Sequence, residues 1–204
     1  MDSLSEICSS ASNCRDCDLH FSRKRVVCGA GPSEARIMII GEAPGSAEDE
    51  KGIPFVGRSG KLLDSVLKSV GMQRDQIYIT NSVKCRPKLG KTPKRNEIKT
   101  CAGYLEMELS AVSPMLVVPM GNSALTSLGF ILKRKFDRIS EIVGKVIETD
   151  GFFIFPQFHP AAILRNPKRK EYFQEYFKMA KELLDDLGDL SRDEIISKYR
   201  VARP

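Results

Sequence analysis

The segment Ile37-Met38-Ile39-Ile40-Gly41-Glu42-Ala43-Pro44-Gly45 decides the class of fold. Its apolar first half predicts a short buried strand over Arg36 to Gly41, and the glycines and proline that follow predict a loop. A helix comes next and ends at Gly71, a residue type that commonly terminates helices. The apolar residues of this helix share one face: Leu62, Leu63, Val66, Leu67 and Val70. Strand, loop and helix in this order are typical of α/β proteins.

Strands and helices continue to alternate along the chain. Strands are predicted at Ile77–Thr80 and Met115–Met120, a helix is expected to begin at Thr92-Pro93, and another follows Gly121. Asp150-Gly151 predicts the turn of a hairpin. The alternation predicts a central, mainly parallel β-sheet flanked by helices on both faces, a three-layer α/β/α architecture.

The two ends of the chain differ from this middle part. Residues 1–35 are polar, carry cysteines and contain glycine and proline, so we expect a loop-rich lobe. A long amphipathic helix is predicted over 173–187, and Ser191 and Glu194 have the spacing of a capping box for a short last helix. We predict a single domain over 1–188 and a helical tail over 189–204.

Composition indicates a soluble globular protein. The chain has 204 residues, of which 42 % are hydrophobic and 28 % are charged. Its longest apolar runs are far too short to cross a bilayer, and its first residues lack the features of a signal peptide. We therefore expect a cytoplasmic protein that does not contact membranes, and we expect it to be a monomer.

Positive charge is concentrated in a few segments. The net charge is +6, and between Lys84 and Lys99 a single acid, Glu97, stands among the basic residues Lys84, Arg86, Lys88, Lys91, Lys94, Arg95 and Lys99. Smaller clusters lie at Arg23-Lys24-Arg25, Lys133-Arg134-Lys135 and Lys168-Arg169-Lys170. Any one of them is compatible with an ordinary solvated surface, but together they favour binding to a polyanion such as nucleic acid.

The cysteines of a cytosolic chain indicate metal or redox chemistry before disulfides. Cys14-Arg15-Asp16-Cys17 is a C-x-x-C pair, and Cys85 and Cys101 lie far downstream beside the basic segment. Four such thiolates suit tetrahedral zinc or a [4Fe–4S] cluster, and their spacing does not choose between the two. We interpret Cys8 and Cys28 as small core residues or surface thiols, with a role as cluster ligands as the alternative.

Three polar segments follow predicted strands: Gly41 to Gly45, Asn81, and the stretch from Gln157 to His159. The carboxyl ends of parallel strands lie at one edge of a sheet, where ligands bind, so these segments are expected to meet there. Taken singly, each has an ordinary explanation as a βα turn, a turn asparagine or a core histidine. The glycine-rich turn is neither a P-loop nor a Rossmann fingerprint.

Jointly, three blocks resemble the family 4 uracil-DNA glycosylases, the iron–sulfur branch of that superfamily. The first block is Gly41-Glu42-Ala43-Pro44-Gly45, with Glu48-Asp49 and Gly52-Ile53-Pro54-Phe55-Val56-Gly57-Arg58-Ser59-Gly60 after it. The others are Thr80-Asn81-Ser82-Val83-Lys84-Cys85-Arg86-Pro87 and His159-Pro160-Ala161-Ala162-Ile163-Leu164-Arg165-Asn166-Pro167. The resemblance covers roughly residues 14 to 187, in the family's order.

The resemblance implies an enzyme that flips uracil out of DNA and hydrolyses its glycosidic bond without a lyase step. In this scheme Glu42 and His159 are catalytic, Phe55 stacks on the base, and Asn81 reads its edge. The loop that includes Gly41, Ala43 and Gly45 lines the substrate. The implied ligands of a [4Fe–4S] cluster are Cys14, Cys17, Cys85 and Cys101, and the expected DNA contacts are Arg58, Ser59, Arg86, Arg165 and Lys168.

The chemistry fits these residue types. An asparagine amide can accept from uracil N3–H and donate to O4, whereas cytosine presents the opposite pattern. A histidine can donate to O2 as negative charge grows on the departing base, and a carboxylate can stabilise the sugar cation or orient water. Two alternatives stay open: the same fold acting on thymine mismatches or deaminated purines, and a metal-stabilised DNA-binding module without catalysis. Uracil in double- or single-stranded DNA remains possible as substrate.

Overall fold

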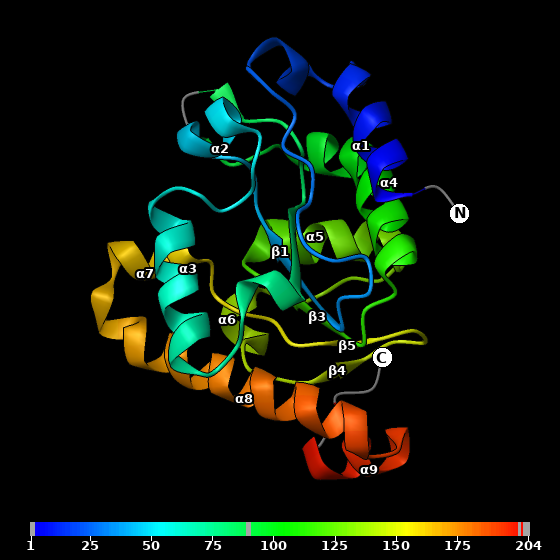
Figure 1. The fold of residues 1–204 in the computed structure, drawn as a ribbon, viewed down its shortest axis with the longest axis vertical. Helices are drawn as coiled ribbons and strands as arrows, with labels where there is room; N and C mark the ends of the chain where they lie inside the picture. The colour runs from blue at the N-terminus through cyan, green and yellow to red at the C-terminus, as the bar shows by residue number, and fades with distance from the viewer. Residues whose placement is uncertain (1–2, 89–90, 200, 202–204) are drawn as a thin grey trace.

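The predicted strand after Arg36 lies at the heart of the sheet. In the computed structural model, which describes residues 3–88, 91–199 and 201, β1 (Ile37–Gly41) is buried along its whole length. It pairs in parallel with β2 (Ile77–Asn81) on one side and β3 (Leu116–Pro119) on the other. Beyond β3 come β5 (Phe153–Ile154), which is parallel, and β4 (Ile147–Glu148), which is antiparallel, so the order is β2-β1-β3-β5-β4 (Figure 1).

Helices cover both faces of this sheet (Figure 1). One face shares an apolar core with α3 (Arg58–Ser69), α7 (Pro160–Arg165), α8 (Lys170–Asp189) and α9 (Arg192–Tyr199). The side chains of β1 alternate between the two cores, because Ile37 and Ile39 point to this face while Met38 and Ile40 point to the other.

The other face packs on α4 (Arg95–Val112), α5 (Asn122–Ile131) and α6 (Ile139–Ile142). A further helix, α1 (Leu4–Asn13), lies against α4. The shorter helical pieces are η1 (Asp18–Phe21), α2 (Ser46–Lys51), η2 (Arg74–Gln76) and η4 (Pro167–Arg169). The three-layer α/β/α prediction, with a mainly parallel sheet, is confirmed.

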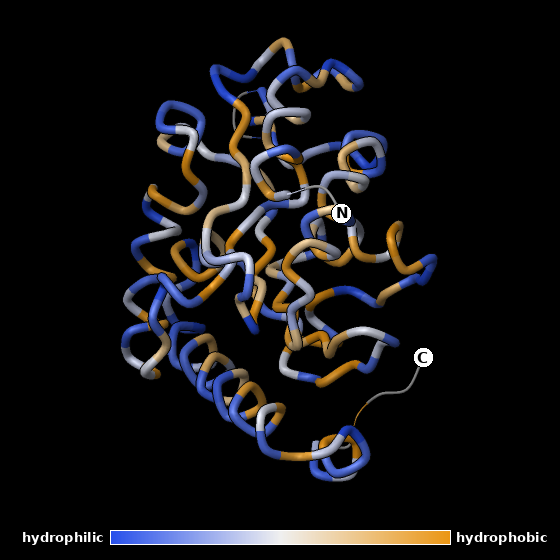
Figure 2. Tube along the Cα trace, turned by 45° about the vertical axis from the view of Figure 1, so that its right-hand side comes forward, coloured by the Kyte–Doolittle hydropathy of each residue, from blue (hydrophilic) through white to orange (hydrophobic). Residues whose placement is uncertain are grey.

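The long amphipathic helix predicted from the sequence is α8. Its buried residues recur at helical spacing: Phe173, Phe177, Ala180, Leu183 and Leu187. Figure 2 shows the hydrophobic side of this helix facing the body of the molecule and its hydrophilic side facing outward. Burial of this stripe fixes α8 across the face of the sheet.

The C-terminal segment docks on the domain. Ile195 of α9 is fully buried in the same core as α8, and the Arg192 guanidinium forms an ion pair with Glu148 at 2.7 Å. The predicted capping box is confirmed, because the Ser191 backbone N–H donates to the Glu194 carboxylate at 2.8 Å. The predicted division of the chain at 188/189 stays a prediction.

Two parts expected to be loops contain helices. The N-terminal lobe begins with α1, whose capping box joins Ser3 and Glu6: the Ser3 N–H donates to the Glu6 carboxylate at 2.6 Å. The loop after Gly45 contains α2, which ends at Gly52 in the left-handed region with φ of 73°. The loop-rich lobe therefore includes one regular helix, and the loop predicted after Gly41 is interrupted by a short one. Polar helices this short carry too few apolar positions to show a clear period.

The prediction that a helix begins at Thr92-Pro93 was also wrong by a few residues. The helix α4 begins at Arg95, after Lys94. The Glu97 carboxylate turns back and accepts a hydrogen bond from the Lys94 backbone N–H at 2.6 Å. The cap is thus supplied by a glutamate inside the first turn rather than by a threonine before it.

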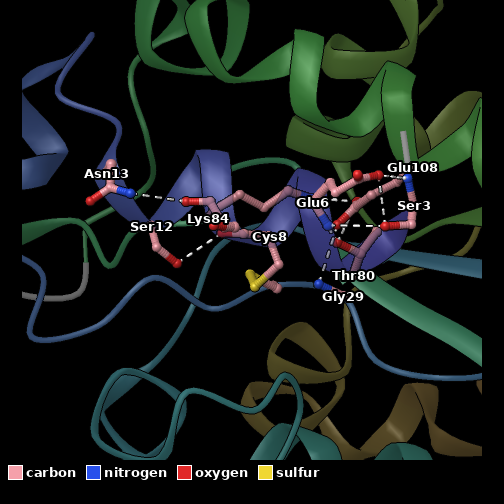
Figure 3. The surroundings of a disulfide bond; sticks show 11 residues. Ser3, Glu6, Cys8, Ser12, Asn13, Gly29, Thr80, Lys84 and Glu108 are labelled. Carbon is pink, nitrogen blue, oxygen red and sulfur yellow. Dashed lines mark hydrogen bonds and ion pairs between the residues drawn. A yellow bond between two sulfur atoms is a disulfide. The ribbon is translucent and has the colours of Figure 1, made fainter. Parts of the chain in front are cut away.

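The interpretation of Cys8 and Cys28 as unpaired residues is corrected by the structure. They form a disulfide that joins α1 to the segment before β1, with a Cα–Cα distance of 5.6 Å (Figure 3). The physical reason is packing, because α1 lies along α4 and brings Cys8 next to a segment that is distant in sequence. None of the helices in the described ranges is long and apolar enough to cross a membrane.

Candidate active site

The three polar segments meet at the carboxyl ends of the strands, as predicted. Gly41 and Asn81 are the last residues of β1 and β2 and face each other in register. Gln157 forms a parallel β-bridge with Met120, just beyond the end of β3. His159 follows Gln157 by two residues and therefore lies at the same edge of the sheet. A groove of about 400 Å³ opens there, and it is lined by Glu42, Ala43, Gly45, Phe55, Arg58, Ser59, Asn81 and His159, among others.

Asn81 offers a free acceptor at the floor of the groove. Its side chain is buried, and among the described residues its Oδ1 atom has no hydrogen-bond partner. Such an atom costs free energy unless a ligand satisfies it. Gly41 makes the close approach possible, because a Cβ there would lie 2.4 Å from Asn81 Oδ1 and 2.5 Å from the Phe55 ring.

Phe55 is held in an unusual backbone conformation. Its φ is +54°, in the left-handed region that bulky residues rarely adopt, and its side chain is 5 % exposed. Arg74 stabilises this turn by donating to the carbonyls of Pro54 at 2.7 Å and Phe55 at 3.2 Å. Gly60 is required as well, because a Cβ there would lie 1.8 Å from the Phe55 carbonyl oxygen. The surroundings thus fix one face of the aromatic ring at the groove.

His159 presents a hydrogen-bond donor. The backbone N–H of Ala161 donates to its Nδ1 atom at 3.2 Å, while its shielded Nε2 atom has no partner among the described residues. Burial, reinforced by the positive charge of Arg165, lowers the pKa of His159 to about 4. The ring is therefore neutral near pH 7, and because Nδ1 accepts, the proton sits on Nε2. The ring centroid lies 5.9 Å from that of Phe55.

Glu42 is the carboxylate of the groove. It follows β1 directly, and the Ser123 hydroxyl at the start of α5 donates to its Oε2 at 2.8 Å. This contact engages one oxygen of a carboxylate that lines the groove. Ser123 was not identified from the sequence, because its partner is distant in the chain and only the packing of α5 on the sheet joins the two.

Glu48 also lines the groove. The sequence placed it in the first block but predicted no role for it. Its side chain is 8 % exposed, and its Oε1 accepts from the Gly57 backbone N–H at 2.7 Å. A Cβ at Gly45 would lie 2.6 Å from Oε2 of the same carboxylate. Glu48 therefore ties the loop after β1 to the turn that carries Phe55.

The predicted metal ligands also come together. Cys14, Cys17, Cys85 and Cys101 are free, and all four line one cavity between η1 and α4. The Arg23 guanidinium donates to the Cys85 sulfur at 3.2 Å. Burial raises the pKa of Cys17, Cys85 and Cys101, the last to about 12, while Lys84 acts in the opposite direction on Cys101.

The donor set is soft, since it consists of thiols alone. Cysteines are the ligands that hold iron–sulfur clusters and also bind zinc, so the residues present fit either group. Within the described ranges, no group of three or more cysteine, histidine or acidic side chains is arranged to hold a single metal ion. The pairing of Cys8 with Cys28 leaves these four as the cysteines with free sulfurs.

A buried ion pair joins Lys84, which also lines the cysteine cavity, to Glu108 (Figure 3). The Lys84 ammonium donates to Glu108 at 2.6 Å, to Thr80 at 2.7 Å and to the Asn81 carbonyl at 2.9 Å. Both charged side chains are 3 % exposed. Glu108 also accepts from the Gly29 N–H at 3.2 Å, so one network connects β2, α4 and the segment after Cys28.

The expected DNA contacts lie at different distances from the groove. Arg58 and Ser59 line it, whereas Arg165 and Lys168 are exposed on α7 and η4 without lining it. Arg86 lies 3.9 Å from the Asp49 carboxylate, outside the lining. The groove is bordered instead by Pro87 and Lys91, of which only the charge of Lys91 was noted from the sequence.

Comparison with known proteins agrees with this site. The model of the family "Uracil DNA glycosylase superfamily" matches residues 28–181. A type-4 uracil-DNA glycosylase of Archaeoglobus fulgidus is 39 % identical over 187 residues, which cover 90 % of this chain and 94 % of that protein. One from Sulfurisphaera tokodaii is 38 % identical, covering 90 % and 86 %, and one from Thermotoga maritima is 39 % identical, covering 80 % and 84 %.

The matched family model includes every residue that lines the groove, and the similarity to the Archaeoglobus fulgidus protein extends over nearly all of that protein's length. It confirms the resemblance found in the three sequence blocks. The chain belongs to the uracil-DNA glycosylase superfamily, among its type-4 members.

Proposed function

We propose that this enzyme binds uracil flipped out of DNA in the groove at the strand ends and hydrolyses its N-glycosidic bond to leave an abasic site. The observation that carries the proposal is a pair of atoms that line one groove and have no hydrogen-bond partner within the described part of the chain: the acceptor Oδ1 of Asn81 and the donor Nε2–H of His159. Uracil offers the complementary groups, since N3–H is a donor and O2 is an acceptor.

Asn81 is the reader of the base. Its free Oδ1 accepts from N3–H, and its amide N–H donates to O4. Cytosine has an unprotonated N3 and an amino group at position 4, so it would leave both partners unsatisfied, at a cost of about 1–3 kcal/mol each. Phe55 supplies the ring on which the base stacks, and its fixed turn makes that platform available before the base arrives.

His159 and Glu42 act on the two charges that bond breaking creates. The C1′–N1 bond breaks with its electron pair leaving on uracil, and neutral His159 donates from Nε2 to the O2 atom, where negative charge grows. Glu42, held by Ser123, stabilises the sugar cation and orients the water whose oxygen bonds to C1′. The proton that this water loses passes to the Glu42 carboxylate, while uracil leaves as the anion. Water is the nucleophile in this scheme, so no strand cleavage follows.

The cavity between η1 and α4 would hold a [4Fe–4S] cluster through Cys14, Cys17, Cys85 and Cys101. When bound, the cluster crosslinks the N-terminal lobe to the segment after β2 and to α4. Its ligands flank the basic segment, so the role that we propose is structural: it fixes Arg86 to Lys99 against DNA phosphates. Glu42, Asn81 and His159 of the same chain line the groove, so one copy supplies every group of the proposed reaction, and we propose that a monomer acts on DNA.

A panel of substrates tests the proposal. End-labelled oligonucleotides that contain uracil, hypoxanthine or mismatched thymine are incubated with excess enzyme and then treated with alkali. We expect cleavage at uracil only, and loss of this activity in Asn81→Asp, whose carboxylate cannot donate to O4. Unchanged uracil cleavage by Asn81→Asp would contradict the assigned reader, and cleavage at another base alone would assign another lesion.

Two further readouts separate the remaining alternatives. Strand breaks that appear without alkali would show a lyase step, for which the groove offers the amine of Lys91. A brown protein with about four irons per chain supports the cluster, whereas one zinc in a colourless protein contradicts it.

A further inference from the structure

A second groove, of about 410 Å³, adjoins the candidate active site. Pro87 and Lys91 line both grooves, so the two grooves adjoin at these residues. One wall of the second groove is η1, which ends at Phe21, and the other wall carries Lys88 and Lys94. A polymer that enters the active site can therefore extend into this groove without leaving the surface.

Phe21 is exposed and yet held in place. It is 73 % exposed, the highest exposed fraction among the large apolar side chains of the described residues. Its ring centroid lies 3.7 Å from that of His20. The turn is pinned at Ser22, whose hydroxyl donates to the Leu19 carbonyl at 3.1 Å and to the Arg86 carbonyl at 2.8 Å.

A lone exposed apolar residue is ordinary on a protein surface. Phe21 differs because it borders a groove that is basic and leads to the site of the reaction. Lys88, Lys91 and Lys94 line the same groove as Phe21. The lining also contains two acids: Asp18 is exposed, and Glu97 is buried and accepts from the Lys94 N–H at 2.6 Å. A rigid aromatic ring among lysines is the arrangement that binds single-stranded nucleic acid.

We propose that this groove binds the DNA strand next to the extruded uracil, and that Phe21 stacks on an unpaired base of that strand. The inference rests on the proposed function and extends it, because it names where the substrate runs beyond the flipped nucleotide. The lysines contact the phosphates, and the ring accepts any base, since every base has a π face. A paired base has both faces covered by its neighbours, so the groove favours unpaired DNA.

Fluorescence tests the stacking directly. The chain contains no tryptophan, so Phe21→Trp introduces a single reporter. Titration with a single-stranded oligonucleotide that carries 2′-fluoro-2′-deoxyuridine, with several nucleotides on each side, is expected to quench its emission. Phe152→Trp, in the hairpin at the amino end of β5, is the matched control and is expected to stay unquenched. Binding of DNA without quenching at position 21 would overturn the proposal.

Affinity gives a second test that is independent of the reporter. Phe21→Ala is expected to weaken binding of the long single strand by at least about fivefold, and Phe21→Tyr, which keeps a ring, is expected to restore it. The original enzyme is expected to bind this long strand more tightly than a short strand that ends beside the uracil. In Phe21→Ala the ratio of these two affinities is expected to fall by the same factor. Suppose that the original enzyme cleaves uracil, and that Phe21→Ala binds the long and the short oligonucleotide with the same affinities as the original enzyme. The second groove is then not a binding site. If the original enzyme fails to cleave uracil, the proposed function fails, and the quenching test still decides the groove.

Discussion

Asn81 and His159 show what the sequence reveals at the scale of single residues. Each follows a predicted strand, and each alone has an ordinary explanation as a turn or core residue. The structure separates them from ordinary residues, because each keeps a shielded polar atom without a partner among the described residues. Ser123 and Glu48 were not predicted, since their importance lies in bonds to Glu42 and Gly57 that only the folded chain creates.

Gly60→Ala should disturb the stacking platform. The added Cβ would lie 1.8 Å from the Phe55 carbonyl oxygen, so the turn that carries Phe55 must shift. We expect a lower melting temperature and a loss of uracil cleavage. Gly103→Ala in α4 is the control, because its Cβ meets nothing within 4 Å, and it should stabilise the helix by about 0.5–1 kcal/mol. Equal behaviour of the two variants would contradict the assigned contact.

His159 should make stability depend on pH. Its folded pKa is about 4, below the ordinary histidine value of 6.5, so the unfolded chain binds the extra proton first as pH falls. Its contribution is fully present above pH 6.5 and is lost as pH falls towards 4, by up to about 3 kcal/mol. The measurement is denaturant unfolding of the original protein and of His159→Gln across this range. A constant difference between the two would contradict a buried neutral imidazole.

At the scale of elements, strands were easier to predict than short helices. The isoleucine-rich run of β1 is the continuous apolar stretch of a fully buried strand, and the apolar stripe of α8 is long enough to show the helical period. The helices α1 and α2 are polar and short, and only the Ser3–Glu6 capping box offered a signal for α1. The disulfide of Cys8 with Cys28 depends on the packing of α1 against α4, which no local pattern contains.

The Lys84–Glu108 pair should stabilise the junction between β2 and α4. Lys84→Met leaves Glu108 charged and buried, so we expect a loss of about 3–5 kcal/mol in the free energy of unfolding. Lys84→Met/Glu108→Gln removes that charge while the amide still accepts from Gly29, and it should be more stable than Lys84→Met alone. The exposed Lys181–Asp185 pair is the control, and Lys181→Met should cost less than about 1 kcal/mol. Additive losses in the double variant would contradict the account.

At the scale of the whole molecule, the lysines that we assign to DNA binding and the two grooves lie at the same end of the sheet. Lys91 borders both grooves, whereas Lys181 lines a hollow at the amino end of the strands, beside Arg36 and Ile77. The sequence indicated a polyanion from its clusters, but it could not show which clusters face the substrate. That depends on how the loops after β2 and β3 are placed by the fold.

Binding of DNA should weaken steeply with salt. A plot of log affinity against log salt concentration is expected to be linear, and Lys91→Gln should reduce the magnitude of its slope by about one unit. Lys181→Gln, at the opposite end, should leave the slope unchanged. A flat response for the original protein, or equal slopes for both variants, would contradict the assignment of phosphate contacts to this end.

The most direct test of the central claim is a single-turnover assay on end-labelled, uracil-containing DNA, with strand breaks scored before and after alkali. The account predicts breaks only after alkali, and rates that fall by about 10²–10³ in Glu42→Ala and His159→Ala. Binding of the same DNA at low salt should persist in both variants. Tight, salt-dependent binding by the original protein without any release of uracil would contradict the account and leave a DNA-binding module.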